Sequence, residues 1–158
     1  MDSKANDPEC LQLIEGFFEK IADTENFNRV AKNLVPIRAN KTSVLYELTI
    51  ERENVNGKET LHGGQTAALV DIVTASTVCC TVRDIPMVSV EISISYLLPA
   101  LIGEVITIEG NVLKLGRNMA FTEAEFRRKR DGALIAKGKH TLAILNHLKK
   151  DDGKPIDQ

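Results

Sequence analysis

The stretch GQTAALVDIVTASTVCCTV, residues 64–82, decides the fold. It predicts a long helix that is apolar on nearly every side, and Asp71 is its only acidic or basic side chain. In a globular protein, a helix without a polar face is buried all round. Its many small residues let other backbone come close. The rest of the chain must therefore supply enough structure to surround this helix.

Strand patterns stand on both sides of the predicted helix. Before it, residues 35–39 and 42–50 favour strands, and a polar loop follows over 51–59. After it, three long strand candidates are joined by the hairpin turns 115–118 and 131–132; they span 104–114, 119–130 and 133–146.

The segment after Pro86 alternates cleanly, as a half-buried strand does. The pattern puts Val88, Val90, Ile92 and Ile94 on one face, and Ser89, Glu91, Ser93 and Ser95 on the other. Together the elements predict an α+β domain in which one antiparallel sheet wraps around the whole circumference of a central helix, the hotdog fold.

The N-terminal part predicts helix. Asp7 suits an N-cap and Pro8 the first helical position, and apolar residues recur at helical spacing over 11–21. We expect one domain over residues 1–150, with a helical lead-in at 7–32 and a polar tail at 151–158.

Composition narrows the class of protein. The chain has 158 residues and a net charge of −2, so nothing favours nucleic-acid binding. No apolar run is long enough for a membrane span, and the first residues resemble neither a signal nor a transit peptide. The three cysteines indicate reduced, buried thiols. These features predict a cytoplasmic protein, with an association with mitochondria left open.

Three segments carry a resemblance to a known family: NGKETLHGGQTAALVD (56–71), VSVEISISYLLPA (88–100) and LKLGRNMAFTEAEF (113–126). Over residues 27–145 the chain resembles the hotdog-fold acyl-CoA thioesterases, of the phenylacetate-degradation and superfamily-member-two types. The resemblance implies an enzyme of lipid metabolism that cleaves fatty acyl-CoA, with no metal and no cofactor beyond the coenzyme A of its substrate. It also implies a homotetramer, a dimer of dimers with active sites at the dimer interface.

The resemblance also assigns residues. Asp71 matches the catalytic carboxylate, while Asn56, His62 and Gly63 match the positions that hold and polarise the thioester carbonyl. Ser89 matches the serine that places the attacking water. The coenzyme A segments would be Tyr96, Leu97, Leu98, Pro99, Ala100 and Leu101, and Lys114, Leu115, Gly116, Arg117, Asn118 and Met119. Leu98 and Leu101 depart from the polar residue and lysine of many relatives. The alternative role for these leucines is to line an acyl channel for medium or long chains.

The residue types also support this chemistry without the resemblance. Gly63, at the start of the helix, offers an unpaired N–H to a developing oxyanion, and Asp71 serves as base or nucleophile. Eight residues at about 1.5 Å each separate them by roughly 12 Å, too far for both to act on one carbonyl. A twofold axis that sets two such helices antiparallel would bring Asp71 of one chain to Gly63 of the other.

Plainer interpretations remain for each feature. The His62-Gly63 pair suits any helix start, Asp71 an interface ion pair, and Ser89 a solvent-facing strand position. Lys114 and Arg117 suit an ordinary basic hairpin, and His140 and His147 carry no motif, which favours structural or surface roles. Two rival functions also stay open: a non-catalytic acyl-CoA or fatty-acid binding module, and a hydratase, which requires a histidine base beside its acid.

Overall fold

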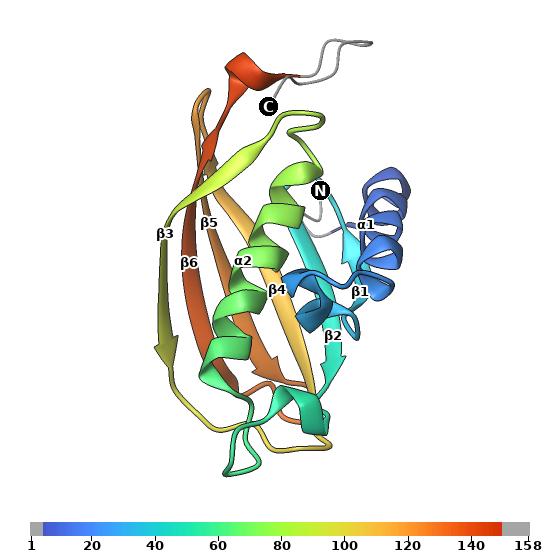
Figure 1. The fold of residues 1–158 in the computed structure, drawn as a ribbon, viewed down its shortest axis with the longest axis vertical. Helices are drawn as coiled ribbons and strands as arrows, with labels where there is room; N and C mark the ends of the chain where they lie inside the picture. Colours follow the sequence, from blue (N-terminus) through green and yellow to red (C-terminus); the bar gives the residue numbers. More distant parts are fainter. Residues whose placement is uncertain (1–4, 150–158) are drawn as a thin grey trace.

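A computed structural model describes residues 5–149; the predicted tail at 151–158 lies outside them. In this part of the chain a six-stranded antiparallel sheet has the order β1-β2-β4-β5-β6-β3, and one long helix crosses its face (Figure 1). The elements are α1 (Pro8–Ala22), η1 (Phe27–Ala31), β1 (Val35–Ala39), β2 (Ser43–Thr49), η2 (Arg52–Asn54), α2 (Gly63–Cys79), β3 (Met87–Tyr96), β4 (Val105–Leu115), β5 (Met119–Arg128), β6 (Leu134–Ile144) and η3 (Asn146–Leu148).

The architecture confirms the predicted α+β hotdog fold. Strands form within one or two residues of the predicted bounds, and α2 spans Gly63–Cys79 in place of 64–82. The loop over 51–59 contains the short helix η2, in which the side chain of Asn54 accepts from the N–H of Glu51. Asp7 caps α1 as predicted, accepting from the N–H groups of Glu9 and Cys10.

The sheet covers one side of α2 and does not close around it (Figure 1). Leu69, Val70 and Val73 are fully buried. One stripe of the helix stays accessible, formed by Gly64, Ala68, Asp71, Ala75 and Cys79. The prediction of a sheet around the whole circumference is therefore wrong for a single chain. A sheet with two open edges leaves this stripe of an otherwise apolar helix facing outward.

Two glycines let α2 lie directly on the sheet. A Cβ atom at Gly138 of β6 would come within 2.5 Å of a methyl carbon of Val70, and one at Gly110 of β4 within 2.5 Å of the Thr77 hydroxyl oxygen. Both contacts are far inside van der Waals distance, so the sequence places glycine where helix and sheet backbones meet.

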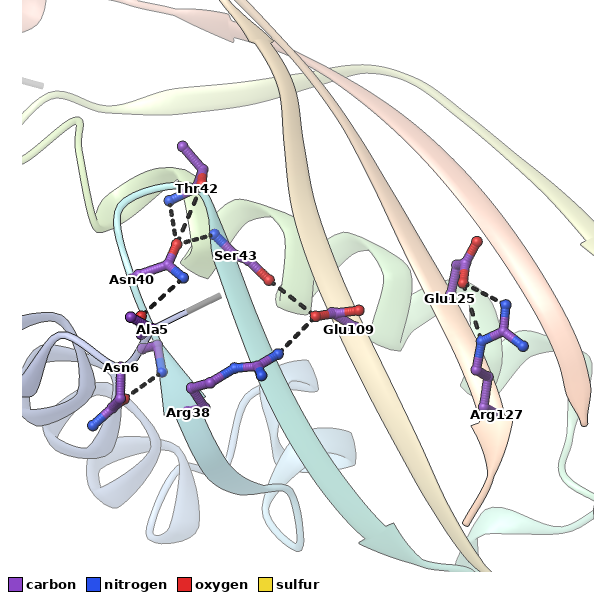
Figure 2. A network of polar contacts seen from close by, with 10 residues as sticks. Ala5, Asn6, Arg38, Asn40, Thr42, Ser43, Glu109, Glu125 and Arg127 are labelled. Carbon is purple, nitrogen blue, oxygen red and sulfur yellow. Dashed lines mark hydrogen bonds and ion pairs between the residues drawn. The ribbon is translucent and has the colours of Figure 1, made fainter. Parts of the chain in front are cut away.

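A polar network fixes the start of α1 to the β1–β2 hairpin (Figure 2). The side chain of Asn6 accepts from the N–H of Ala39, and the side chain of Asn40 donates to the carbonyl of Ala5. Beside them, Arg38 and Ser43 both bond to one oxygen of Glu109, at 2.8 Å and 3.3 Å. The contacts of Asn6 and Asn40 hold the start of α1 at the hairpin, and Glu109 joins the hairpin to β4.

A β-bulge in β3 changes which side chains face α2. Ser89 lies opposite Leu142 and Ile92 opposite His140, with a register shift between Ser89 and Glu91. An extra residue in one strand switches the faces of the residues that follow it. Ser89 and Ile92 therefore share the helix-facing side, and the prediction that they lie on opposite faces is wrong.

β3 lies at the edge of the sheet and pairs only with β6 within the described residues. Val88 and Val90 are 49% and 58% exposed, although both are apolar. An edge strand with one free side and exposed apolar side chains is a template for another strand.

None of the described helices has the length and apolar character needed to cross a membrane.

Replacing Gly138 with alanine tests the helix–sheet contact. Val70 is β-branched, so its side chain has little rotamer freedom and the helix itself must shift. We expect Gly138→Ala to lower the free energy of unfolding by about 1–3 kcal/mol. Gly16→Ala is the matched control, because a Cβ at Gly16 of α1 meets nothing within 4 Å. In urea denaturation Gly16→Ala should have a free energy of unfolding equal to or above that of the parent. A Gly138→Ala variant as stable as Gly16→Ala would contradict the contact.

Candidate active site

The centre of the accessible stripe carries a carboxylate that accepts one hydrogen bond and lies at the end of a row of polar side chains. Ser89 of β3 donates its hydroxyl to Oδ1 of Asp71 at 3.2 Å. His140 of β6 stands behind them, with Nε2 2.9 Å from Ser89 Oγ and 3.7 Å from Asp71 Oδ1. Its Nδ1 lies 2.6 Å from the hydroxyl of Thr74, one turn along α2 from Asp71. The sequence prediction that Asp71 and Ser89 act together is consistent with this geometry.

The hydrogen bonds nearest Asp71 follow from the carboxylate, which accepts. An ionised Asp71 only accepts, so Ser89 gives its single proton to Asp71. The short contact between Ser89 and His140 then requires a proton on Nε2 of His140. Nδ1 of His140 contacts the Thr74 hydroxyl, which also donates to the carbonyl of Val70 at 2.7 Å. The polar contacts therefore run from Thr74 through His140 and Ser89 to Asp71, and the hydrogen bond from Ser89 orients the carboxylate.

The environments of the two ionisable groups differ sharply. The side chain of Asp71 is 49% exposed, whereas that of His140 is fully buried. Burial lowers the pKa of His140 below its ordinary 6.5, and the nearby Asp71 carboxylate partly opposes this shift. Solvent therefore reaches Asp71 and not His140, which contacts Ser89 from the buried side.

His140 is the main residue that the sequence interpretation undervalued. It lacks a motif, but it sits two residues from Leu142 and four from Ile144, on the buried face of a predicted strand. A polar residue at an inward-facing position requires partners. The alternation of buried positions along this strand was the sequence signal that could have identified His140. His147, by contrast, is exposed as predicted.

The start of α2 forms a second group. His62 caps the helix, since its Nδ1 accepts from the N–H of Gly64 at 2.8 Å. Its proton, when neutral, is thus on Nε2, which faces outward as a donor. Within residues 5–149 no acceptor bonds to the N–H of Gly63. Tyr96, at the end of β3, donates its hydroxyl to the carbonyl of Gly63 at 2.9 Å and so ties β3 to the helix start.

Asn56 belongs to the loop beside this helix start. Its side-chain oxygen accepts from the N–H of Lys58 at 2.8 Å, and its Nδ2 donates to the Thr60 hydroxyl at 2.9 Å. The backbone of Thr60 bridges to Leu101, and that of Leu61 donates to Ala100. Asn56, His62 and Gly63 therefore gather with the segment 96–101 at the N-terminal end of α2.

The predicted site is divided within one chain. Eight residues of continuous helix, roughly 12 Å, separate Gly63 from Asp71. The two predicted coenzyme A segments are further apart, because the hairpin 114–119 lies at the opposite end of the sheet from residues 96–101 (Figure 1). There, Asn146 donates to the carbonyl of Arg117.

Both coenzyme A segments are largely exposed. In the first, all residues from Tyr96 to Leu101 except Ala100 are exposed, with Leu98 and Leu101 at 47% and 51%. In the second, Lys114 and Arg117 are exposed and form no ion pair within the described residues. Unpaired cations in a hairpin are available for phosphate groups.

Known proteins match this chain in sequence and fold. Residues 58–135 match the family model of the thioesterase superfamily. The chain is 52% identical to a putative esterase of Caenorhabditis elegans, over 81% of this chain and 76% of the relative. It is 39% identical to acyl-coenzyme A thioesterase 13 of Homo sapiens, over 85% of this chain and 96% of the relative. Thioesterase superfamily member 2 of zebra fish has a similar structure, with a TM-score of 0.82 and 38% identity over 86% and 98% of the chains.

The buried histidine makes stability depend on pH. In the unfolded chain His140 takes up a proton near pH 6.5, whereas in the folded state it does so only at a lower pH. Stability should therefore be greatest above pH 6.5 and fall as the pH drops from there toward the folded pKa. His140→Gln removes this contribution, so urea denaturation between about pH 8 and about pH 5 should show a flatter profile.

The control for this measurement is His147→Gln, which alters an exposed histidine and should keep the profile of the parent. A parent and a His140→Gln variant with the same pH dependence would contradict the buried, neutral state assigned to His140.

Proposed function

Since this chain belongs to the thioesterase superfamily and is a thioester hydrolase, we propose that its substrates are fatty acyl-coenzyme A molecules and its products the free acid and coenzyme A. One observation carries the proposal: an accessible carboxylate, Asp71, accepts a hydrogen bond from Ser89, which in turn contacts the buried His140. The relative in Homo sapiens is named for this activity, which supports the substrate class.

The proposed reaction places a water molecule beside the carboxylate of Asp71 and the hydroxyl of Ser89. Asp71 takes a proton from the water as it attacks the thioester carbonyl, or attacks the carbonyl itself; both routes use the same carboxylate. Negative charge that develops on the carbonyl oxygen meets the free N–H of Gly63 and the Nε2–H of His62. A single such donor is typically worth about 3 kcal/mol in the transition state. The thiolate of coenzyme A then leaves and takes up a proton. When water attacks, the other product is the free acid; when Asp71 attacks, the product is an anhydride with Asp71, which water hydrolyses to the free acid and the regenerated carboxylate.

The two halves of the proposed site, the Asp71 carboxylate and the Gly63 N–H, must come from two chains. β3 carries both: Ser89 near its start holds Asp71, and Tyr96 at its end holds Gly63. If the free edges of two β3 strands pair antiparallel, with the twofold axis between residues 92 and 93, Ser89 of one copy lies opposite Tyr96 of the other. That arrangement brings Asp71 of one copy toward Gly63 of the second, and buries the exposed Val88 and Val90 beside the interface.

The same pairing supports the assignment of the coenzyme A segments. Residues 96–101 follow the end of β3, and the hairpin 114–119 lies near the beginning of β3 through its contacts with β6. Antiparallel pairing moves 96–101 of one copy toward 114–119 of the other. Lys114 and Arg117 would then bind the phosphates. A tetramer, as a dimer of such dimers, is part of the proposal.

The rival functions meet specific obstacles. A hydratase requires a histidine base beside its acid, and His140 does lie 3.7 Å from Asp71, a proximity that the sequence spacing did not make obvious. The imidazole is fully buried, however, and a base must touch its substrate. A non-catalytic binding module has no need for an exposed carboxylate that a serine and a histidine orient.

The carboxylate is tested by Asp71→Asn. The amide neither accepts a proton nor attacks, so kcat for decanoyl-CoA should fall by about 10²–10⁴, measured as thiol release. Asp23→Asn, a change of the exposed aspartate at the end of α1, is the matched control and should retain the activity of the parent. Full turnover by Asp71→Asn would overturn the assignment.

Sharing of the site between chains is tested by mixing two inactive variants. Gly63→Pro removes only an N–H, since proline suits the first helical position and His62 already has the extended backbone that precedes proline. A dimer of Asp71→Asn with Gly63→Pro contains one intact site and one doubly defective site. After subunit exchange, a one-to-one mixture should regain roughly one quarter of the parental activity.

Exchange itself is verified by native mass spectrometry. If mixed dimers form and activity stays at the level of the separate variants, the shared site is wrong.

A further inference from the structure

The segment 97–101 follows β3 without forming a helix or strand of its own, so neighbouring elements decide its shape. Backbone hydrogen bonds hold its beginning to Ile135 of β6 and its end to the loop before α2. Between these two anchors stands Pro99, which has no N–H. The carbonyl of Pro99 accepts from a side chain instead, Nη2 of Arg128, at 3.2 Å.

Glu104 fixes the end of the segment from the turn that leads into β4. Its Oε2 accepts from the N–H of Leu101 at 2.8 Å, and its backbone N–H donates to the carbonyl of Leu101 at 3.1 Å. The turn between them contains Gly103 with a φ of 85°, a conformation that favours glycine. Glu104 therefore holds the backbone on both sides of Leu101.

The guanidinium of Arg128 joins these two contacts from the end of β5. Its Nε lies 3.2 Å from Oε1 of Glu104, while Nη2 donates to Pro99 and Nη1 to Asp131 at 3.0 Å. The three nitrogens of a rigid, planar fork thus have three different partners. The side chains of Arg128 and Glu104 are only 16% and 15% exposed, so the pair is largely withdrawn from water.

Stability alone gives little reason for such a pair. Removing two charges from water costs about as much free energy as their attraction returns, and apolar side chains of similar volume often stabilise a fold as well or better. The specific effect of this pair is on geometry, because fixed donors and acceptors hold an irregular, exposed backbone in one conformation. A loop ordered in advance binds its ligand more tightly, since it loses less conformational entropy on binding.

We propose that Glu104 and Arg128 are positioning residues that hold the segment 97–101 in the conformation that binds coenzyme A. The inference rests on the proposed function, because it takes this segment as part of the coenzyme A site. Neither side chain is proposed to touch the thioester. Their effect therefore falls on the affinity for coenzyme A and not on the reaction at Asp71.

Two acyl thioesters separate this role from a general loss of structure. Decanoyl-CoA carries the whole coenzyme, whereas S-decanoyl-N-acetylcysteamine lacks the nucleotide, the phosphates and most of the pantetheine arm. The double variant Glu104→Leu, Arg128→Met replaces both charges with apolar side chains of similar size, so its stability in urea should be near that of the parent. Its KM for decanoyl-CoA should rise about tenfold with kcat retained. Its kcat/KM for the N-acetylcysteamine thioester should equal that of the parent.

Arg128→Lys is the second variant, because it keeps a positive charge beside Glu104 and loses the fork that reaches Pro99. Its KM for decanoyl-CoA should rise as well. Lys129→Met is the matched control, since Lys129 pairs with Glu47 at 2.6 Å, and its KM should equal that of the parent. An unchanged KM in both the double variant and Arg128→Lys would overturn the proposal, as would an equal loss of kcat/KM with both thioesters.

Binding of free coenzyme A separates a failure of this inference from a failure of the proposed function. Calorimetry should show an affinity about tenfold weaker in the double variant than in the parent, a result that supports the inference even if no thiol is released. Equal affinities overturn the inference, while thiol release from decanoyl-CoA would leave the proposed function intact. A parent without affinity for coenzyme A overturns the inference too.

Discussion

The rigidity of α2 constrains the whole account. Its backbone is continuous from Gly63 to Cys79, so the N–H of Gly63 and the carboxylate of Asp71 stay roughly 12 Å apart in one chain. Side-chain motion cannot bring two points on one helix together. A carbonyl that contacts both groups must therefore lie between two helices, and this requirement decides the form of the proposed enzyme.

The surfaces that a single chain leaves uncovered are consistent with this form. The accessible stripe of α2 carries Asp71, and the unpaired edge of β3 carries the partners of both half-sites, Ser89 and Tyr96. The exposed valines of β3 are apolar residues at an open sheet edge. One twofold contact would cover the edge, approach the stripe and complete two active sites.

Much of the fold and part of the candidate site could be predicted from the sequence. The all-round apolar character of residues 64–82 indicated the central helix, and the alternation of the later segments indicated the antiparallel sheet, because these patterns record which faces are buried. The capping role of Asp7 followed from residue type alone. The grouping of Asp71 with Ser89 came from the resemblance, and the hydrogen bond between them supports it.

The failures have physical causes. The bulge after Ser89 breaks the period of two, and no residue type in VSVEIS marks where the extra residue falls. His140 gains its meaning from Thr74 and Ser89, which are far from it in sequence. The open stripe of α2 was missed because an apolar helix implies that something covers it, without telling whether that cover belongs to the same chain.

The most direct test of the shared site is a crystal structure of the protein with a non-hydrolysable acyl-CoA analogue. The account predicts a carbonyl oxygen within hydrogen-bond distance of the Gly63 N–H of one chain, with the Asp71 carboxylate of the other chain facing the carbonyl carbon. A carbonyl bound at Gly63 with no Asp71 of a second chain beside it, or an analogue bound wholly within one chain, would contradict it.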